Sequence, residues 1–240
     1  MTIRQTIPLG GAAPPGPRLP ARTGMIIAID GPAGAGKGTL ARRLAAHLGL
    51  AYLDTGLLYR AVGVAVKRAG GDPDNAEDAG AAARRLTPAT LLDPALRSEE
   101  AAGLASRVAA IPAVRAALLD FQRHFAESPP DGAQGAVLDG RDIGTVVCPT
   151  ANIKLFITGS LEVRAGRRAM ELRQNGIEAI DERVLQEMRE RDARDSQRGV
   201  APLAPAPDAV VLDTTALDVD AVFAVALAVV TRGRSVVVTV

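Results

Sequence analysis

Short apolar runs alternate with longer amphipathic stretches along most of the chain. The runs that read as buried strands are Met25–Ile29, Ala136–Leu138, Ile153–Ile157 and Ala209–Leu212, with a weaker candidate at Ala51–Leu53. Helical spacing of apolar residues predicts helices over Lys37–Leu48, Leu57–Arg68, Ala76–Leu86, Ser98–Ala110, Ala113–Ala126, Leu161–Gln174, Asp181–Asp195 and Val219–Thr231. Strands that alternate with helices indicate an α/β fold, with a five-stranded parallel sheet and helices on both of its faces.

The first strand-like run leads directly into a glycine-rich loop. Residues 31–39 read GPAGAGKGT, and helical spacing begins again at Leu40. Glycines let the backbone turn tightly and point several N–H groups at one anion, and a helix N-terminus favours negative charge. The lysine can reach β- and γ-phosphates, and a hydroxyl can support Mg²⁺. We therefore predict a loop that binds the phosphates of a nucleotide, in which Thr39 can support Mg²⁺, made of Gly31, Pro32, Ala33, Gly34, Ala35, Gly36, Lys37, Gly38 and Thr39.

The loop departs from the usual phosphate-loop pattern at one position. Gly38 separates Lys37 from Thr39, whereas the usual pattern has Ser or Thr directly after the lysine. This Gly-Lys-Gly-Thr arrangement is similar to that of nucleoside monophosphate kinases, and it disfavours a generic ATPase or GTPase.

Polar clusters follow two other strand-like runs, where ligands bind in parallel sheets. Asp139-Gly140-Arg141-Asp142 is poor packing material, which favours a functional role. Asp139 is suited to hold Mg²⁺ through water, and the planar guanidinium of Arg141 fits phosphate oxygens. After the weaker run, Thr55 is expected to cap the next helix.

Arginines crowd one helix near its predicted end. At about 100° per residue, Arg191, Arg194, Asp195 and Arg198 fall on one side of that helix. A solvated surface pair between Arg191 and Asp195 is the alternative, and it would contribute only about 0.3–0.5 kcal/mol. Prolines follow, so a mobile lid over a nucleotide is the functional interpretation.

Composition narrows the choice of function. Of the 240 residues 48% are hydrophobic but only 2% aromatic, so the core must be aliphatic and base stacking is nearly unavailable. The net charge of +1 gives no field that favours nucleic acid. The single Cys148 excludes an intrachain disulfide framework and reads as a core residue. His47 and His124 lie in helical stretches and read as packing or surface residues.

The ends of the chain differ from the middle. Residues 1–24 hold five prolines without an apolar period, which predicts either a disordered extension or an upstream start ahead of Met25. The segment lacks the apolar stretch of a secretory signal. The Ala221–Val230 run is about half the length needed to span a bilayer and reads as a buried helix. We expect a single domain over residues 25–231, a tail over 232–240, no membrane or nucleic-acid partner, a monomer and a cytoplasmic location.

Together these strings closely resemble the bacterial cytidylate kinases. The resemblance covers Met25 to about Thr231 and is carried by residues 29–40, 52–60, 105–115, 139–147 and 190–195, ending with 201–203 and 209–213. Adenylate kinases share the first of these strings but not the last three. The resemblance implies a P-loop NTPase-like three-layer sandwich, with a helical monophosphate-binding region at about 55–127 and a short lid at about 160–200.

The resemblance also implies roles for the matching residues. The acceptor base would be held by Ser106, Arg115 and Asp142, where a carboxylate accepts from the cytosine amino group that uracil lacks. Thr55, standing where many members have Ser, can donate to phosphate, and Asp195 is expected at the ribose. The acceptor phosphate would be gripped by Arg60, Arg141, Arg191 and Arg198, and the lid candidates for the donor phosphates are Arg167, Arg168 and Arg194. The expected catalytic set is Lys37, Arg141, Arg191 and Arg194.

The implied reaction is phosphoryl transfer from ATP, with Mg²⁺, to CMP or dCMP, which gives ADP and CDP or dCDP. The alternatives are a kinase for another small acceptor (UMP, AMP or shikimate) and a phosphate-loop switch that works through a protein partner. The switch would leave Arg60, Arg141 and Arg198 without a task. Many members carry short β-strands in an insert, but Leu86–Glu100 is short and holds two prolines, so we expect those strands to be missing. The relative use of CMP, dCMP and UMP stays open.

Overall fold

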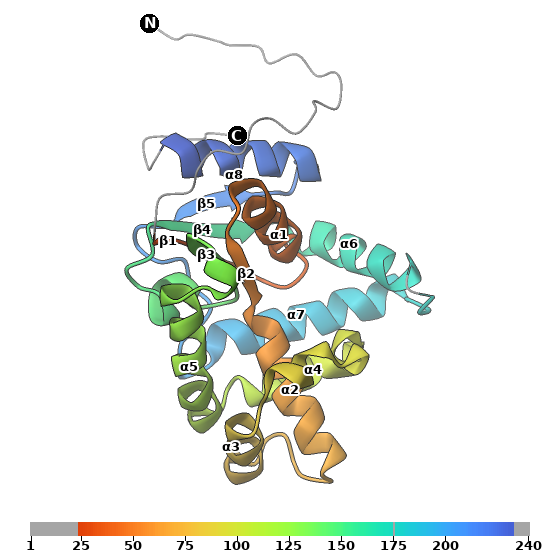
Figure 1. The fold of residues 1–240 in the computed structure, drawn as a ribbon. Helices are drawn as coiled ribbons and strands as arrows, with labels where there is room; N and C mark the ends of the chain where they lie inside the picture. The colour runs from red at the N-terminus through yellow and green to blue at the C-terminus, as the bar shows by residue number, and fades with distance from the viewer. Residues whose placement is uncertain (1–23, 175, 233–240) are drawn as a thin grey trace, which may run out of the picture.

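Five parallel strands form one sheet in the computed structural model, which describes residues 24–174 and 176–232 (Figure 1). The order across the sheet is β2-β3-β1-β4-β5, and every neighbouring pair is parallel. All five predicted runs, the weaker one included, are strands: β1 (Met25–Asp30), β2 (Ala51–Asp54), β3 (Gly135–Asp139), β4 (Ile153–Thr158) and β5 (Val210–Asp213). The predicted extension and tail lie outside the described residues, apart from Gly24 and Arg232.

Helices connect the strands, as parallel pairing requires. Each predicted helix is present, with ends that differ by a few residues: α1 (Lys37–Leu48), α2 (Thr55–Arg68), α3 (Ala76–Arg84), α4 (Glu99–Val108), α5 (Pro112–Glu127), α6 (Leu161–Gln174), α7 (Asp181–Gln197) and α8 (Val219–Arg232). The sequence pattern did not predict three short 3₁₀ turns, at Pro88–Leu92, Pro94–Arg97 and Pro130–Gly132, or a π-helical turn at Ile143–Val147.

The strands place alternate side chains in two separate cores, one on each face of the sheet. Ile27 and Ile29 of β1 pack with α1 and α8, whereas Ala28 packs on the other face with α5 and the π-helical turn. This alternation follows from the period of two along a strand. Helices therefore cover both faces, and the predicted three-layer arrangement is confirmed (Figure 1).

A helical region, α2 to α5, packs around its own core below the sheet (Figure 1). Gly63 lets α2 and α4 approach closely, since a Cβ there would lie 2.6 Å from the Cβ of Leu104. Between residues 86 and 100 the described chain forms 3₁₀ turns and no strand, as expected from its prolines.

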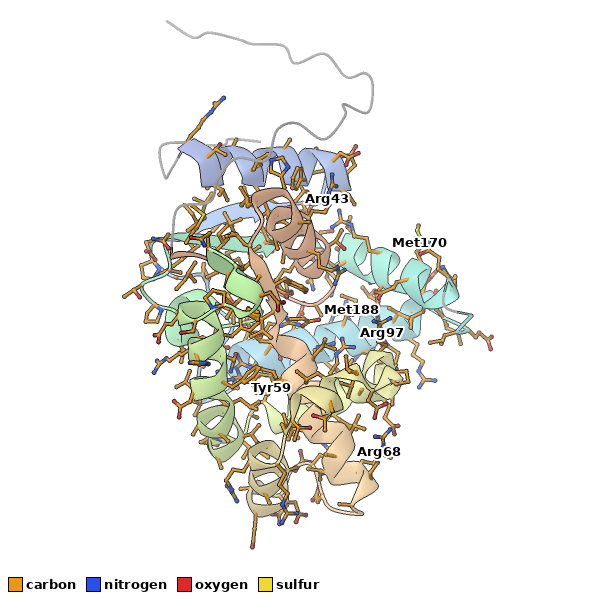
Figure 2. The ribbon with its side chains drawn as sticks, viewed as in Figure 1. Arg43, Tyr59, Arg68, Arg97, Met170 and Met188 are labelled. Carbon is orange, nitrogen blue, oxygen red and sulfur yellow. The ribbon has the colours of Figure 1, made fainter. Side chains whose placement is uncertain are left out.

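The helices α6 and α7 form a hairpin that projects from the sheet and has a small core of its own (Figure 1). Met188 of α7 lies against the phosphate loop, since a Cβ on Gly34 would come 2.9 Å from its methyl group (Figure 2). Met170 of α6 points away from the molecule and is 61% exposed (Figure 2). One face of the hairpin therefore meets the loop and the other faces solvent.

Three local predictions need correction. Thr55 is not the N-cap of α2, because Asp54 holds that position and the Thr55 hydroxyl donates to the Asp139 carbonyl at 2.8 Å. The helix predicted to bury itself at the end of the domain, α8, buries only three of its residues, Ala226, Val229 and Val230. Arg198 lies just beyond α7 in extended backbone, rather than within the helix.

The lone cysteine and the histidines are placed as expected. Cys148 is buried, and burial raises its pKa to about 11. His47 packs edge-on against Phe223, with ring centroids 5.6 Å apart, and His124 is exposed. Among residues 24–174 and 176–232 no single helix is long and apolar enough to cross a membrane. The segments Glu99–Val108 and Pro112–Gly132 together reach that length and composition, but the chain bends by 103° between them.

Gly31→Ala should destabilise the fold strongly. Gly31 has φ of 144°, and a Cβ there would lie 1.9 Å from the Ile157 carbonyl oxygen of β4. Backbone strain and overpacking together should lower the free energy of unfolding by at least about 2 kcal/mol, measured by chemical denaturation. The control is Gly166→Ala, an open position on α6, which should raise stability by about 0.5–1 kcal/mol. Equal stabilities of the two variants would contradict this packing argument.

Candidate active site

The glycine-rich loop joins the end of β1 to the start of α1. Gly34 and Gly36 have φ of 71° and 89°, a region that favours glycine, and Gly36 is the N-cap of α1. Lys37 is buried and its Nζ donates to the Pro32 carbonyl at 2.7 Å. The loop thus folds around its own lysine at a helix N-terminus, an arrangement that suits phosphate.

Lys37 lies in a buried group of charges. Burial lowers the pKa of Lys37, the positive charge of Arg141 lowers it further, and Asp139 opposes both. Burial likewise raises the pKa of Asp139, and the charge of Asp54, its register partner on β2, adds to the rise. Tyr52 donates to Asp139 at 2.9 Å and holds this carboxylate in place.

A cavity of about 630 Å³ opens beside the loop and brings the predicted residues together. It runs from the phosphate loop, past the ends of β2 and β3, to α4 and the inner side of α6 and α7. Three loop residues, Gly31, Pro32 and Ala35, do not line it. The predicted residues that do are Ala33, Gly34, Gly36, Lys37, Gly38, Thr39, Thr55, Arg60, Ser106, Arg115, Asp139, Arg141, Asp142, Arg191, Arg194, Asp195 and Arg198.

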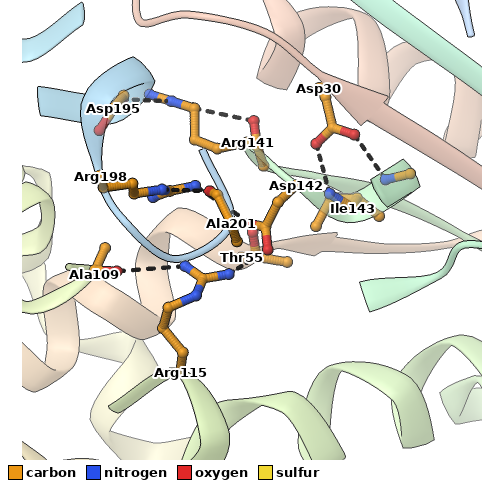
Figure 3. Close-up of polar contacts among 12 residues, drawn as sticks. Asp30, Thr55, Ala109, Arg115, Arg141, Asp142, Ile143, Asp195, Arg198 and Ala201 are labelled. Carbon is orange, nitrogen blue, oxygen red and sulfur yellow. Dashed lines mark hydrogen bonds and ion pairs between the residues drawn. The ribbon is translucent and has the colours of Figure 1, made fainter. Parts of the chain in front are cut away.

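Arg115 and Asp142 form a buried ion pair at one end of the cavity (Figure 3). Arg115 also donates to the Ala109 carbonyl at 3.4 Å, and its guanidinium lies 5.8 Å from the centre of the Tyr59 ring. Burial raises the pKa of Asp142, and the guanidinium groups of Arg115 and Arg198 act against that rise. The planar guanidinium of Arg115 and the carboxylate of Asp142 therefore lie side by side. Together they could donate to and accept from the edge of a planar polar ligand.

Arg141 and Asp195 form a second pair, with Nε to Oδ2 at 2.9 Å (Figure 3). Although burial alone would raise the pKa of Asp195, Arg141 and Arg191 lower it below its ordinary value. Ser106 reaches Asp195 only at 3.5 Å, the same distance at which Arg194 reaches Ser106. The pair with Arg141 is therefore the strong contact, and those from Ser106 are weak.

Arg191 is held differently from its neighbours. Its Nε is buried and has no hydrogen-bond partner within the described residues. Burial, together with the positive charge of Arg141, lowers the pKa of Arg191 to about 9. A buried N–H of a charged group without a partner is costly, so an anion that accepts from this Nε would stabilise it.

The lid arginines do not all face the cavity. Arg167, predicted as a lid candidate, does not line it, because its guanidinium donates to Thr214 and to the Leu217 carbonyl. Arg168 does line the cavity and pairs with Glu99 of α4 and Glu171 of α6. The two arginines are adjacent in sequence, so helical rotation sends one to the loop after β5 and the other to the site.

Sequence reasoning missed a further arginine that supports the loop. Arg164 is buried, and it donates to the Ala33 carbonyl at 3.0 Å, the Gly159 carbonyl at 2.9 Å and Asp192 at 2.6 Å. It joins α6, α7 and the phosphate loop. The only signal in the sequence was the concentration of arginines in residues 164–168, which read RAGRR. The sequence does not show which of these arginines turn inward.

The oxygen donors near Lys37 fit Mg²⁺. Thr39 offers a hydroxyl, and Asp139 and Asp54 offer carboxylates, all of them hard ligands on the cavity wall. Within the described residues no group of three or more His, Cys, Asp or Glu side chains could hold a metal ion. Mg²⁺ commonly takes one or two protein oxygens and completes its shell with phosphates and water, which matches this donor set.

A glycine loop between a strand and a helix, facing a basic cavity at the carboxyl ends of a parallel sheet, defines a phosphate-loop nucleotide-binding protein. The sequence model of one family, described as Cytidylate kinase, matches residues 27–232. Proteins named cytidylate kinase are similar to this chain over most of its length. That of Paramagnetospirillum magneticum is 64% identical over 87% of this chain and 99% of its own, and that of Rhodospirillum rubrum is 63% identical over 85% and 95%. The chain therefore belongs to the cytidylate kinase family, and the resemblance stated from its motifs is confirmed.

Asp139→Asn should stabilise the protein at neutral pH in the absence of nucleotide. An acid whose pKa is higher when folded, about 6 against an ordinary value of 3.8, contributes stability that is full below about pH 4 and is lost as the pH rises toward 6. Asparagine does not titrate. The variant should therefore gain about 1–3 kcal/mol over the parent between pH 4.5 and 7.5, measured by denaturant unfolding.

Asp213→Asn, at the exposed end of β5, is the matched control. Hydrogen bonds from the Thr215 hydroxyl and backbone lower the pKa of Asp213, so its removal should have the opposite sign and cost stability at neutral pH. A pH-independent difference between Asp139→Asn and the parent would show that burial does not govern Asp139.

Proposed function

We propose that the protein transfers the γ-phosphoryl group of ATP to CMP or dCMP, producing ADP and CDP or dCDP. One observation carries the proposal: a single cavity joins the phosphate loop to a pocket lined by Arg60, Arg141, Arg191 and Arg198. Two anionic substrates can thus share one space without a wall between them. The cytoplasmic location and monomeric state expected from the sequence belong to the same proposal.

The reaction needs charge neutralisation rather than a general base. The attacking atom is a phosphate oxygen, which is already largely ionised because the second pKa of such a group is about 6. Lys37 and the arginines would offset the repulsion between two polyanions and align them for in-line transfer. Thr39, and Asp139 through water, would hold the Mg²⁺ that accompanies ATP and supplies further positive charge at its phosphates.

The acceptor phosphate would take the place for which Arg191 has no protein partner. Arg141, already oriented by Asp195, would approach the same phosphate from the end of β3. Arg60 would approach from α2, where its Nη1 donates to the Leu96 carbonyl at 2.9 Å. Guanidinium groups on three elements would thereby surround the acceptor phosphate, so the positive charge is in place before the reaction begins.

The base would be read by the Arg115–Asp142 pair. Asp142 would accept from the cytosine amino group, and Arg115 would donate to the ring acceptors. Ser106 lines the same region from α4. Uracil presents an oxygen where cytosine has its amino group, so the carboxylate would repel it.

The lid would exclude water from the transfer. Arg168 and Arg194, on α6 and α7, face the same cavity as the phosphate loop and would contact the donor phosphates. Water in the site would otherwise accept the phosphoryl group.

An acceptor panel tests the proposal. ADP release from ATP and Mg²⁺ should be fast with CMP and dCMP, slower with UMP and AMP, and near background without an acceptor. If the enzyme preferred UMP, AMP or shikimate, that compound would take the place of CMP as the proposed acceptor. ADP release that did not depend on any acceptor would favour a nucleotide switch.

Arg191→Ala should lower kcat/KM for CMP by about 100-fold or more, because it removes a charge that neutralises the acceptor phosphate. Arg189→Ala is the matched control. Arg189 lies on the same helix and is exposed, and within the described residues its side chain donates to Gln186 alone. Steady-state kinetics should separate the two, and thermal unfolding should show both folded. Unaltered kinetics in Arg191→Ala would remove this residue from the site.

Asp142→Asn should weaken the preference for CMP over UMP, because an amide can donate as well as accept. We expect the ratio of kcat/KM values to fall about 10- to 100-fold, the range of one good base contact. Asp120→Asn on the exposed side of α5 should leave the ratio as in the parent. If Asp142→Asn kept the parental ratio, Asp142 would not read the base.

A further inference from the structure

Asp30, the last residue of β1, is a buried carboxylate to which the proposed mechanism gives no step. It is only 4% exposed, and it precedes Gly31, the first residue of the phosphate loop. Asp30 lies between the sheet and the phosphate loop, but its hydrogen-bond partners belong to neither. They are the backbone N–H groups of Ile143 and Gly144, next to Arg141 and Asp142, which face the cavity.

Each oxygen of Asp30 accepts one backbone N–H from the chain that follows β3 (Figure 3). Oδ1 accepts from Ile143 and Oδ2 accepts from Gly144, both at 2.7 Å. These two residues open the π-helical turn Ile143–Val147, whose first N–H groups have no partner within the turn. Asp30 therefore caps this turn from a neighbouring strand.

A second bond holds the same segment on its other side. The Gly140 N–H donates to the Ile29 carbonyl at 3.0 Å, which continues the pairing of β1 with β3. The end of β1 thus grips the chain at residue 140 and again at residues 143 and 144. Arg141 and Asp142 are the two residues between these anchors, and both face the cavity.

The segment between the anchors needs such support. Asp142 has φ of −147° and ψ of 27°, outside the regular helix and strand regions, and the turn after it is a π-helix, a rare form. Gly144 leaves room for Asp30, because a Cβ there would lie 3.3 Å from Oδ2 and 3.1 Å from Cδ of Lys154. An apolar side chain at position 30 would bury more cheaply but would leave two N–H groups unpaired.

We propose that Asp30 is a positioning residue that aims Asp142 and Arg141 at the acceptor nucleotide, and so sets how sharply the base is selected. The inference rests on the proposed role of Asp142 in reading cytosine. Since Asp30 also leads into the phosphate loop, one residue fixes the backbone of the acceptor-reading segment relative to the cradle for ATP.

The test is Asp30→Asn, assayed with CMP and UMP. The amide keeps one acceptor but turns an NH₂ group toward the second backbone N–H, so one anchor is lost. The ratio of kcat/KM for CMP to that for UMP should fall roughly tenfold, the effect of one hydrogen bond to a charged group. A residue that only supported the fold would lower both values alike and leave the ratio unchanged.

Asn152→Ala is the matched control. Asn152 accepts the Ile26 N–H at 2.7 Å, so the variant removes a comparable side-chain bond from the opposite end of the same strand. Its ratio should equal that of the parent. Gly144→Ala is the second variant, since its Cβ presses on the Asp30 carboxylate without altering it, and its ratio should fall in the same direction.

The outcomes separate the two levels of inference. A parent without preference for CMP would overturn the proposed function and this inference with it. A parent that prefers CMP, with ratios unchanged in Asp30→Asn and Gly144→Ala, would overturn this inference alone. If Asp30→Asn did not fold, the ratio in Gly144→Ala would decide.

Discussion

The concentration of positive charge around one cavity is the constraint on which the rest of the structure depends. Burial lowers the pKa of both Lys37 and Arg191; the charges of Arg141 and Arg191 lower that of Lys37 further, and Arg141 does the same to Arg191. Holding these groups together away from water costs free energy, which Asp139 and Asp195 reduce without removing. Phosphate groups supply the missing negative charge. Nucleotide binding should therefore stabilise the fold as well as lead to reaction.

The sheet ends in a row of carboxylates beside these positive charges. Three neighbouring strands end in aspartate, Asp54 on β2, Asp139 on β3 and Asp30 on β1, and each has a different environment. Asp139 is held by Tyr52 near Lys37, Asp54 raises the pKa of Asp139, and Asp30 takes two backbone N–H groups. Because the strands are parallel, their carboxyl ends and these three aspartates lie at one edge of the sheet, where sheets of this class bind ligands.

Much of this could be predicted from the sequence, because its signals are local. The apolar runs gave all five strands, and the spacing of Gly31 to Thr39 gave the phosphate loop. What could not be predicted depends on contacts distant in sequence. Thr55 turned out to bond the end of β3 rather than cap α2, and Arg167 faces away from the cavity while Arg168 faces it. Arg164, like Asp30, has partners that only the folded chain brings within reach.

The contacts around the cavity differ in strength in a way that matches a closing site. Arg164 ties α6 and α7 to the phosphate loop through bonds of 2.6 to 3.0 Å, so the lid and the cradle for ATP are held together. Ser106, by contrast, meets Arg194 and Asp195 at 3.5 Å, and α2 to α5 have their own core. Movement of the acceptor region against α6 and α7 would therefore break the weak contacts of Ser106 together with the ion pair between Arg168 and Glu99. Because local opening follows the boundaries between separately packed cores, we expect movement at the boundary between the core of α2 to α5 and that of α6 and α7.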